Sequence, residues 1–316
     1  MKLKKLQRRF KKYKPKIFSL SFVLIILVLI SLSLSVVLVN KLLVLKSEND
    51  LQKQQIVKEK NFQNDLKNLQ GKVIKKDYVF KIKWGNLGKR MVEDGVIDKV
   101  KLAQAITGTD QLPNNLDRYF SDGQNKIEVN QKNAQFWVDV LWGLGLANRN
   151  KILEEGEMTA SGDASNFAST GGWTLGPVDP MSVYSKFSYI NLSEKQQKEV
   201  SEIAGSIYRP CCGNSTAFPD CNHGMAMLGL IELMVSQGFS KNEIYKTALA
   251  FNTYWFPQTY LDTALYLQRN GKDYEKVSPK ELLSENFSSA MGTQTISEDV
   301  GKVQWPALEN GGSCAA

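Results

Sequence analysis

Residues 17–39 read IFSLSFVLIILVLISLSLSVVLV, and this stretch decides what the N-terminal part of the chain is. It holds 23 residues without a charge, and serine is the only polar type among them. A helix rises about 1.5 Å per residue, so about 20 apolar residues cross the hydrocarbon core of a bilayer, where a helix satisfies its own backbone groups. The stretch therefore predicts a single transmembrane helix, with the anchor covering residues 17–40.

The residues before the anchor, 1–16, are strongly basic and include no acidic side chain. Their basic residues are Lys2, Lys4, Lys5, Arg8, Arg9, Lys11, Lys12, Lys14 and Lys16. Because positive charge is retained on the cytoplasmic side of a membrane, we expect residues 1–16 to form a cytoplasmic tail of a single-pass cell-membrane protein. The apolar stretch continues into Asn40 and Lys41 without an A-x-A cleavage pattern, which favours a retained signal anchor.

The net charge of +8 does not indicate nucleic-acid binding. The nine basic residues of the tail exceed this whole excess, so the exported remainder is near neutral. We expect the tail to set the topology or to contact anionic lipid headgroups, with membrane lipid as the partner of the anchor and no nucleic acid. A protein partner and the oligomeric state are left open.

Residues 41–76 are rich in Lys, Gln, Glu, Asn and Asp with isolated apolar residues, and they contain no proline. This composition predicts a helical stalk. Leu42, Leu45, Ile56 and Leu66 fit a heptad seam, but polar residues occupy the other seam positions. A single solvated helix and a dimeric coiled coil therefore both stay open.

Residues 77–316 are predicted to form an extracytoplasmic, mainly helical domain, a bundle with long loops around one sizeable core. Helical patterns cover residues 130–147, 193–208, 223–237, 240–255 and 258–269, and another helix starts at Ser278. Ser193 with Gln196 and Ser240 with Glu243 have the spacing of capping boxes. The best strand signal is residues 78–84, and residues 223–237 are apolar nearly all round, which predicts a buried central helix.

A loop at residues 161–176 is rich in glycine, serine and threonine, yet it contains Trp173. It lacks the lysine of a P-loop and the strand and helix context of a dinucleotide fingerprint. We expect this loop to pack over the domain and to cover the cysteine cluster that follows.

The cysteines form the one cluster that could carry chemistry. They are Cys211, Cys212, Cys221 and Cys314, and the first three fall within residues 209–223, RPCCGNSTAFPDCNH. That segment ends at His223, the single histidine of the chain. Cys221 lies at the start of the predicted central helix, where unpaired N–H groups and the macrodipole stabilise a thiolate.

Three uses of this cluster stay open. The preferred hypothesis is a metal site formed by Cys211, Cys212, Cys221 and His223, with Cys314 or a methionine as a further ligand, because thiolate and imidazole suit zinc and sulfur-rich sets suit copper(I). The second is a thiol-disulfide oxidoreductase that uses Cys211, Cys212, Cys221 and Cys314. The third is a structural or partner-binding domain with inert disulfides, one across the 211–221 loop and one to the C-terminal tail.

Whether the protein is an enzyme is left open by the sequence. Hydrolysis through a serine triad is not expected, because the single histidine lies next to cysteines and no G-x-S-x-G motif is present.

Residues 207–255 resemble the thiol-reducing subunit of bacterial cytochrome c maturation. The resemblance rests on Cys211-Cys212, on Gly-Phe-Ser-Lys-Asn-Glu-Ile at 238–244, and on Tyr254-Trp255. It implies a redox role for the cysteines. The C-x-x-C motif of that family is absent here, and neither the stalk nor residues 78–200 correspond to it. The full domain resembles more closely an uncharacterised family of membrane-anchored proteins with a Cys/His motif, which implies no activity.

Overall fold

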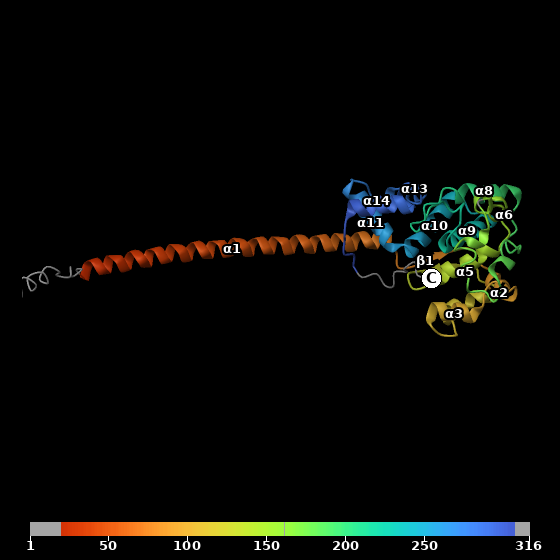
Figure 1. The fold of residues 1–316 in the computed structure, drawn as a ribbon, viewed down its shortest axis with the longest axis horizontal. Coiled ribbons are helices and arrows are strands. Elements are labelled where there is room, and N and C mark those ends of the chain that lie inside the picture. The colour runs from red at the N-terminus through yellow and green to blue at the C-terminus, as the bar shows by residue number, and fades with distance from the viewer. Residues whose placement is uncertain (1–19, 161, 307–316) are drawn as a thin grey trace, which may run out of the picture. The chain divides into compact units, whose positions relative to one another are not determined.

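The computed structural model describes residues 20–160 and 162–306 (Figure 1). The predicted tail at 1–16, the first residues of the anchor and Cys314 lie outside the described residues. The chain divides into two compact units, the first ending at Phe62 and the second beginning at Gln63. Each unit is described by itself.

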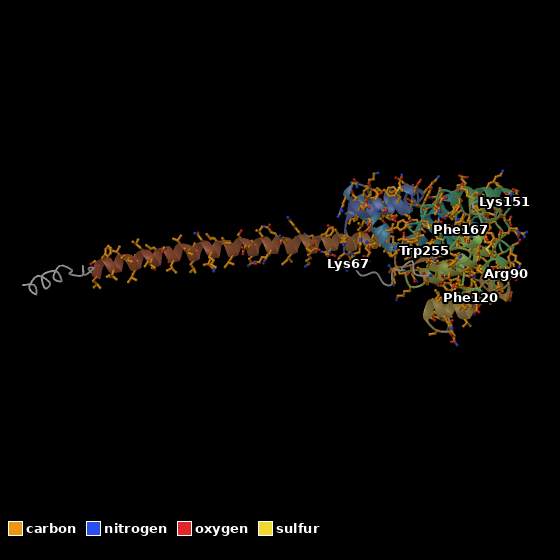
Figure 2. The ribbon with its side chains drawn as sticks, in the orientation of Figure 1. Lys67, Arg90, Phe120, Lys151, Phe167 and Trp255 are labelled. Carbon is orange, nitrogen blue, oxygen red and sulfur yellow. The ribbon has the colours of Figure 1, made fainter. Side chains whose placement is uncertain are left out.

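The first unit is formed by helix α1 (Leu20–Val73), which also continues into the second unit. Its most apolar window has a mean hydropathy of 3.2, and none of it is buried by the residues that the structure describes. Figure 2 shows its side chains pointing outward from the helix. The Ser33 and Ser35 hydroxyls donate to the carbonyls of Ile30 and Ser31, so these polar groups are satisfied within the helix itself. The prediction of one helix long and apolar enough to span a membrane is confirmed.

The last turns of α1 belong to the core of the second unit. Leu66, Leu69 and Val73 are buried there, at the three- and four-residue spacing of one helix face. The predicted stalk, residues 41–76, is therefore helical as far as Val73, and its final part packs as core.

The second unit is mainly helical, as predicted. Its further helices are α2 (Leu87–Glu93), α3 (Lys99–Thr107), α4 (Asn114–Asp117), α5 (Ala134–Ala147), α6 (Lys151–Glu155), α7 (Glu157–Ala160), α8 (Glu194–Ala204), α9 (Asn222–Ser236), α10 (Lys241–Trp255), α11 (Pro257–Arg269), α12 (Pro279–Leu282), α13 (Glu285–Ser288) and α14 (Ala290–Val300). Short 3-10 turns are η2 (Arg118–Phe120), η3 (Ala164–Asn166), η4 (Pro180–Ser182) and η5 (Tyr274–Lys276).

Two short strands form an antiparallel pair, β1 (Tyr78–Phe80) with β2 (Ile127–Val129), in which Tyr78 lies opposite Val129. The predicted strand at 78–84 is thus shorter than expected. The backbone of Lys83 is satisfied instead by the Gln237 side chain, which accepts from the Lys83 N–H at 2.9 Å and donates to its carbonyl at 2.8 Å.

The centre of the unit is the pair α5 and α9, which lie together in Figure 1. Every residue of α9 from His223 to Val235 is buried, which confirms the predicted central helix. The two backbones approach at glycines: a Cβ at Gly229 would meet the Leu141 carbonyl oxygen at 2.6 Å, and one at Gly145 would collide with the Met225 carbonyl. Helix α9 therefore packs closely against α5, and this packing fixes the position of its first turn.

The predicted caps are confirmed. Ser193 with Gln196 and Ser240 with Glu243 form complete capping boxes at the starts of α8 and α10. The helix expected from residue 130 begins only at Ala134, because the Asn130 and Asn133 side chains bind the backbone of a preceding turn. The bundle-like arrangement of these helices stays a prediction.

Candidate metal centre

The candidate site is built on the loop between α8 and α9, which turns back on itself before reaching the helix. The Thr216 N–H donates to the Ile207 carbonyl at 2.8 Å, and the Thr216 hydroxyl donates to the same oxygen at 3.0 Å. The Tyr208 N–H donates to the Leu283 carbonyl, and the Cys212 carbonyl accepts from the Ala290 N–H at 2.9 Å. The loop is thus fixed both within itself and against the α12 to α14 segment.

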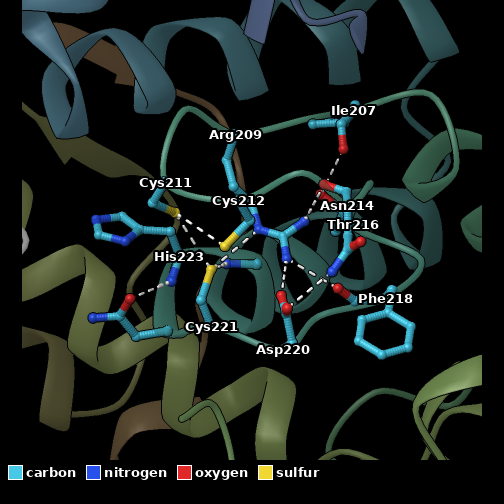
Figure 3. A network of polar contacts seen from close by, with 12 residues as sticks. Ile207, Arg209, Cys211, Cys212, Asn214, Thr216, Phe218, Asp220, Cys221 and His223 are labelled. Atoms are coloured by element: carbon cyan, nitrogen blue, oxygen red, sulfur yellow. Dashed lines mark hydrogen bonds and ion pairs between the residues drawn. The ribbon is translucent and has the colours of Figure 1, made fainter. Parts of the chain in front are cut away.

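Arg209 is the centre of the loop, with its side chain only 1% exposed. Its guanidinium donates to the carbonyls of Asn214 (2.8 Å) and Phe218 (2.9 Å), to the Asp220 carboxylate (2.5 Å) and to the Cys221 sulfur (3.1 Å). Figure 3 shows these contacts converging on the planar group. A buried guanidinium needs such partners, because an unpaired buried charge is strongly destabilising. The loop therefore closes around Arg209.

Three sulfur atoms lie together beside this guanidinium. The Sγ of Cys211 is 3.5 Å from that of Cys221 and 3.5 Å from that of Cys212, and the three lie within 4.8 Å of one another (Figure 3). With zinc–sulfur bonds of about 2.3 Å, two sulfurs at the tetrahedral angle are about 3.8 Å apart. The sulfurs are close to the spacing that one shared metal ion requires.

All three cysteines are free thiols in this structure. A disulfide has an S–S bond of about 2.05 Å, much shorter than the 3.5 Å between Cys211 and Cys221. The disulfide expected across the 211–221 loop is therefore not formed here. Cys314, the expected partner for a second disulfide, lies outside the described residues.

Among the three cysteines, Cys221 is the one whose sulfur accepts hydrogen bonds from groups outside the cluster. It is the N-cap of α9, and its sulfur accepts from the Gly224 N–H at 3.3 Å as well as from Arg209. The hydrogen bond with Cys211, followed by those with Cys212 and Arg209, holds the pKa of Cys221 well below its usual range, although burial opposes this. The hydrogen bond with Cys212, followed by that with Cys221 and by burial, raises the pKa of Cys211. The electrostatics of the cluster therefore favour the thiolate form at Cys221 rather than at Cys211.

His223 is not a member of this three-sulfur group. It lies in the first turn of α9, 6% exposed, with its ring 4.5 Å from the Phe256 ring and 5.6 Å from the Trp255 ring. Burial lowers the pKa of His223 to about 4, so the imidazole is neutral at pH 7. Within the described part of the chain its Nδ1 has no hydrogen-bond partner. The structure therefore brings together the three cysteines of the predicted set and places His223 beside them in an aromatic pocket.

The loop at 161–176 packs against the cysteine loop near its end. The Ser169 N–H donates to the Asp220 carbonyl at 3.1 Å, and the Phe167 and Phe218 rings meet edge to face at 5.4 Å. Its Trp173 is buried rather than free. This loop supports the residues that precede Cys221.

A pocket of about 690 Å³ lies on another side of the cysteine loop, lined by Gly213 to Ser215, Ala217 and Phe218 together with residues of α6 to α8 such as Lys151. No cysteine is among its lining residues. This pocket and the sulfur cluster are therefore different places.

Arg209 is the functional residue that sequence reasoning missed. Its signal was present, since Arg209-Pro210 directly precedes Cys211, but nothing in the spacing says that this arginine is buried or that it turns toward Cys221. The chain matches no family model, no curated protein and no solved structure. The resemblances described above therefore stay predictions, and function has to be argued from the site itself.

Proposed function

We propose that this chain binds a thiophilic metal ion, zinc or copper(I), through Cys211, Cys212 and Cys221, on a domain held at the outer side of a membrane. The single observation that carries the proposal is the convergence of three sulfurs within 4.8 Å, on a loop fixed against a rigid helix. Soft thiolates select ions of this class, whereas calcium and magnesium prefer oxygen ligands.

Electrostatics support an ion at this position. Metal binding takes the protons from the thiols, so three thiolates would place three negative charges in a half-buried site. Arg209 and the Gly224 N–H donate to the Cys221 sulfur and offset only part of that charge. A cation among the three sulfurs would offset the rest.

A fourth ligand is required by zinc, which is four-coordinate in structural sites, and His223 is our proposal for it. Its imidazole is neutral, which is the form that binds metals, and its Nδ1 has no hydrogen bond that would have to break. Copper(I) is expected to be satisfied by the three sulfurs. The identity of the bound ion thus decides whether His223 takes part.

The test is metal analysis of the detergent-solubilised full chain, purified and then exposed to zinc or to copper(I) under reducing conditions. We expect about one ion per chain, and its loss in Cys221→Ser and in Cys211→Ser. Met181→Ser is the matched control, because it removes a sulfur from an exposed side chain outside the cluster. Equal metal content in the cysteine variants and the parent chain would overturn the proposal.

A further inference from the structure

The geometry of the three thiols also determines which disulfides can form among them. Cys211 and Cys212 are neighbours joined by a trans peptide bond, since no cis bond occurs among the described residues. Their Cα atoms are therefore about 3.8 Å apart, below the range of about 4.4 to 6.8 Å that disulfides span. A bond between these two neighbours is disfavoured, so a disulfide formed within the three-cysteine cluster has to involve Cys221.

Cys221 has a close partner in Cys211. Their sulfurs are 3.5 Å apart, whereas a disulfide needs about 2.05 Å, so a closure of about 1.5 Å joins them. Gly213 lies in the loop between them, and a Cβ there would meet nothing within 4 Å, so the loop has free space at this point. The required movement is small compared with the length of the loop.

The two cysteines differ in access. Cys211 is exposed, whereas Cys221 is partly buried and is held by Arg209 and by the first turn of α9. A disulfide arriving from solution therefore meets Cys211 first. Cys221 is then 3.5 Å from the sulfur that it would have to attack.

We propose that Cys211 and Cys221 form a dithiol-disulfide couple, with Cys211 as the entry thiol and Cys221 as the resolving thiol. In the first step the Cys211 thiol passes its proton to the Cys221 sulfur, 3.5 Å away, and the Cys211 sulfur attacks an external disulfide RSSR, forms a mixed disulfide with one RS group and releases the other as RS⁻. In the second step the Cys221 sulfur attacks the Cys211 sulfur and releases the second RS⁻. Two electrons pass from the protein to RSSR, and the protons that the two cysteines carry go to the released thiolates or to solvent.

Arg209 fits both states of this couple. When Cys221 enters a disulfide, the guanidinium loses one acceptor but keeps the Asp220 carboxylate and the carbonyls of Asn214 and Phe218. No unpaired charge is buried by oxidation, so the loop can stay closed around Arg209.

Oxidation would also remove two of the three proposed metal ligands, so a disulfide reagent should release the ion. This consequence rests on the proposed function, whereas the disulfide itself does not.

The experiment uses the full chain carrying Cys314→Ser, freed of metal with a chelator and treated with oxidised glutathione. After alkylation of the remaining thiols, mass mapping of peptides is expected to find Cys211 joined to Cys221. With Cys221→Ser added, the resolving step is blocked and glutathione should stay on Cys211. With Cys212→Ser added instead, the Cys211–Cys221 disulfide should still form.

Two results would overturn the couple: a disulfide between Cys212 and Cys221 in the parent, or a Cys221→Ser chain without glutathione on Cys211. A second arm loads the same chain with zinc and follows ion release during oxidation. If the chain binds no zinc, the proposal of a zinc site fails in that arm, while the metal-free mapping still decides the couple.

Discussion

Arg209 donates from Nε to the Cys221 sulfur at 3.1 Å, from a side chain that is 1% exposed. This contact joins the loop to the N-terminus of α9, because Cys221 is the residue that caps the helix. The loop, the helix start and the sulfur cluster therefore depend on one guanidinium.

Replacement of Arg209 by methionine should destabilise the domain by about 3 kcal/mol, since it removes the ion-pair partner of Asp220 and the donor to the Asn214 carbonyl. Metal affinity should fall with it. Denaturant unfolding of the solubilised chain measures the first effect. Arg118→Met is the control: Arg118 pairs with Glu128 at 2.7 Å, but both side chains are 33% exposed, so its loss should cost below about 1 kcal/mol. Equal costs for the two variants would contradict the central role of Arg209.

A side chain added at Gly224 should disturb the contact between Arg209 and Cys221 sterically. A Cβ at Gly224 would lie 2.7 Å from the Arg209 guanidinium, so Gly224→Ala should push the guanidinium away from Cys221 and cost about 1 to 3 kcal/mol. Gly213→Ala, in the same loop, meets nothing within 4 Å and should be within about 0.5 kcal/mol of the parent. Unfolding and metal titration of the two variants provide the comparison, and an unchanged Gly224→Ala chain would show that Arg209 is not fixed there.

The His223→Phe variant distinguishes zinc binding from copper(I) binding. Phenylalanine keeps an aromatic ring against Phe256 and Trp255 but has no nitrogen to offer. If His223 completes a zinc site, zinc affinity should fall at least about tenfold while copper(I) affinity stays unchanged. Competition titrations with a chromophoric chelator measure both. An equal loss for both ions would point to a packing defect, and no loss for zinc would exclude His223 as its ligand.

The side of the membrane on which the domain lies is tested by protease added to intact cells. The basic tail predicts that the domain is digested and that a tag at the N-terminus is protected. Replacing the nine basic tail residues by glutamine should weaken this preference and yield a mixed topology. Digestion of the domain only after permeabilisation would reverse the proposed orientation.

Local signals in the sequence were enough to find most of the fold. The capping boxes at Ser193 and Ser240 and the apolar run of α9 act within one or two helical turns, so they are read without knowledge of tertiary structure. The cysteines were grouped correctly because eleven consecutive residues, 211 to 221, contain all three. The loop from Cys211 to Cys221 is short enough to bring these cysteines together.

Two features of the site depend on tertiary contacts, which the sequence does not show. The Arg209 side chain turns inward because carbonyls of the same loop and Asp220 converge on it, an arrangement that no spacing rule encodes. His223 is only two residues from Cys221, yet Trp255 and Phe256, at the junction of α10 and α11, hold its ring. Proximity along the chain therefore does not by itself make His223 a member of the three-sulfur group.

Glu232 is a buried carboxyl group that the sequence did not single out. It lies on α9 with no exposure and accepts from the side-chain amides of Asn148 and Asn150. Burial raises its pKa well above the ordinary value of 4.5, although the two amides oppose this, so the folded protein binds a proton there that the unfolded chain has released. Stability should therefore be greatest below about pH 4.5 with respect to this group, and should fall as pH rises from there toward the raised pKa. Glu232→Gln removes the titrating group, and unfolding free energies measured between pH 4 and 8 should then show a weaker decline than in the parent chain. Identical pH profiles in the two proteins would mean that Glu232 stays ionised in its buried site.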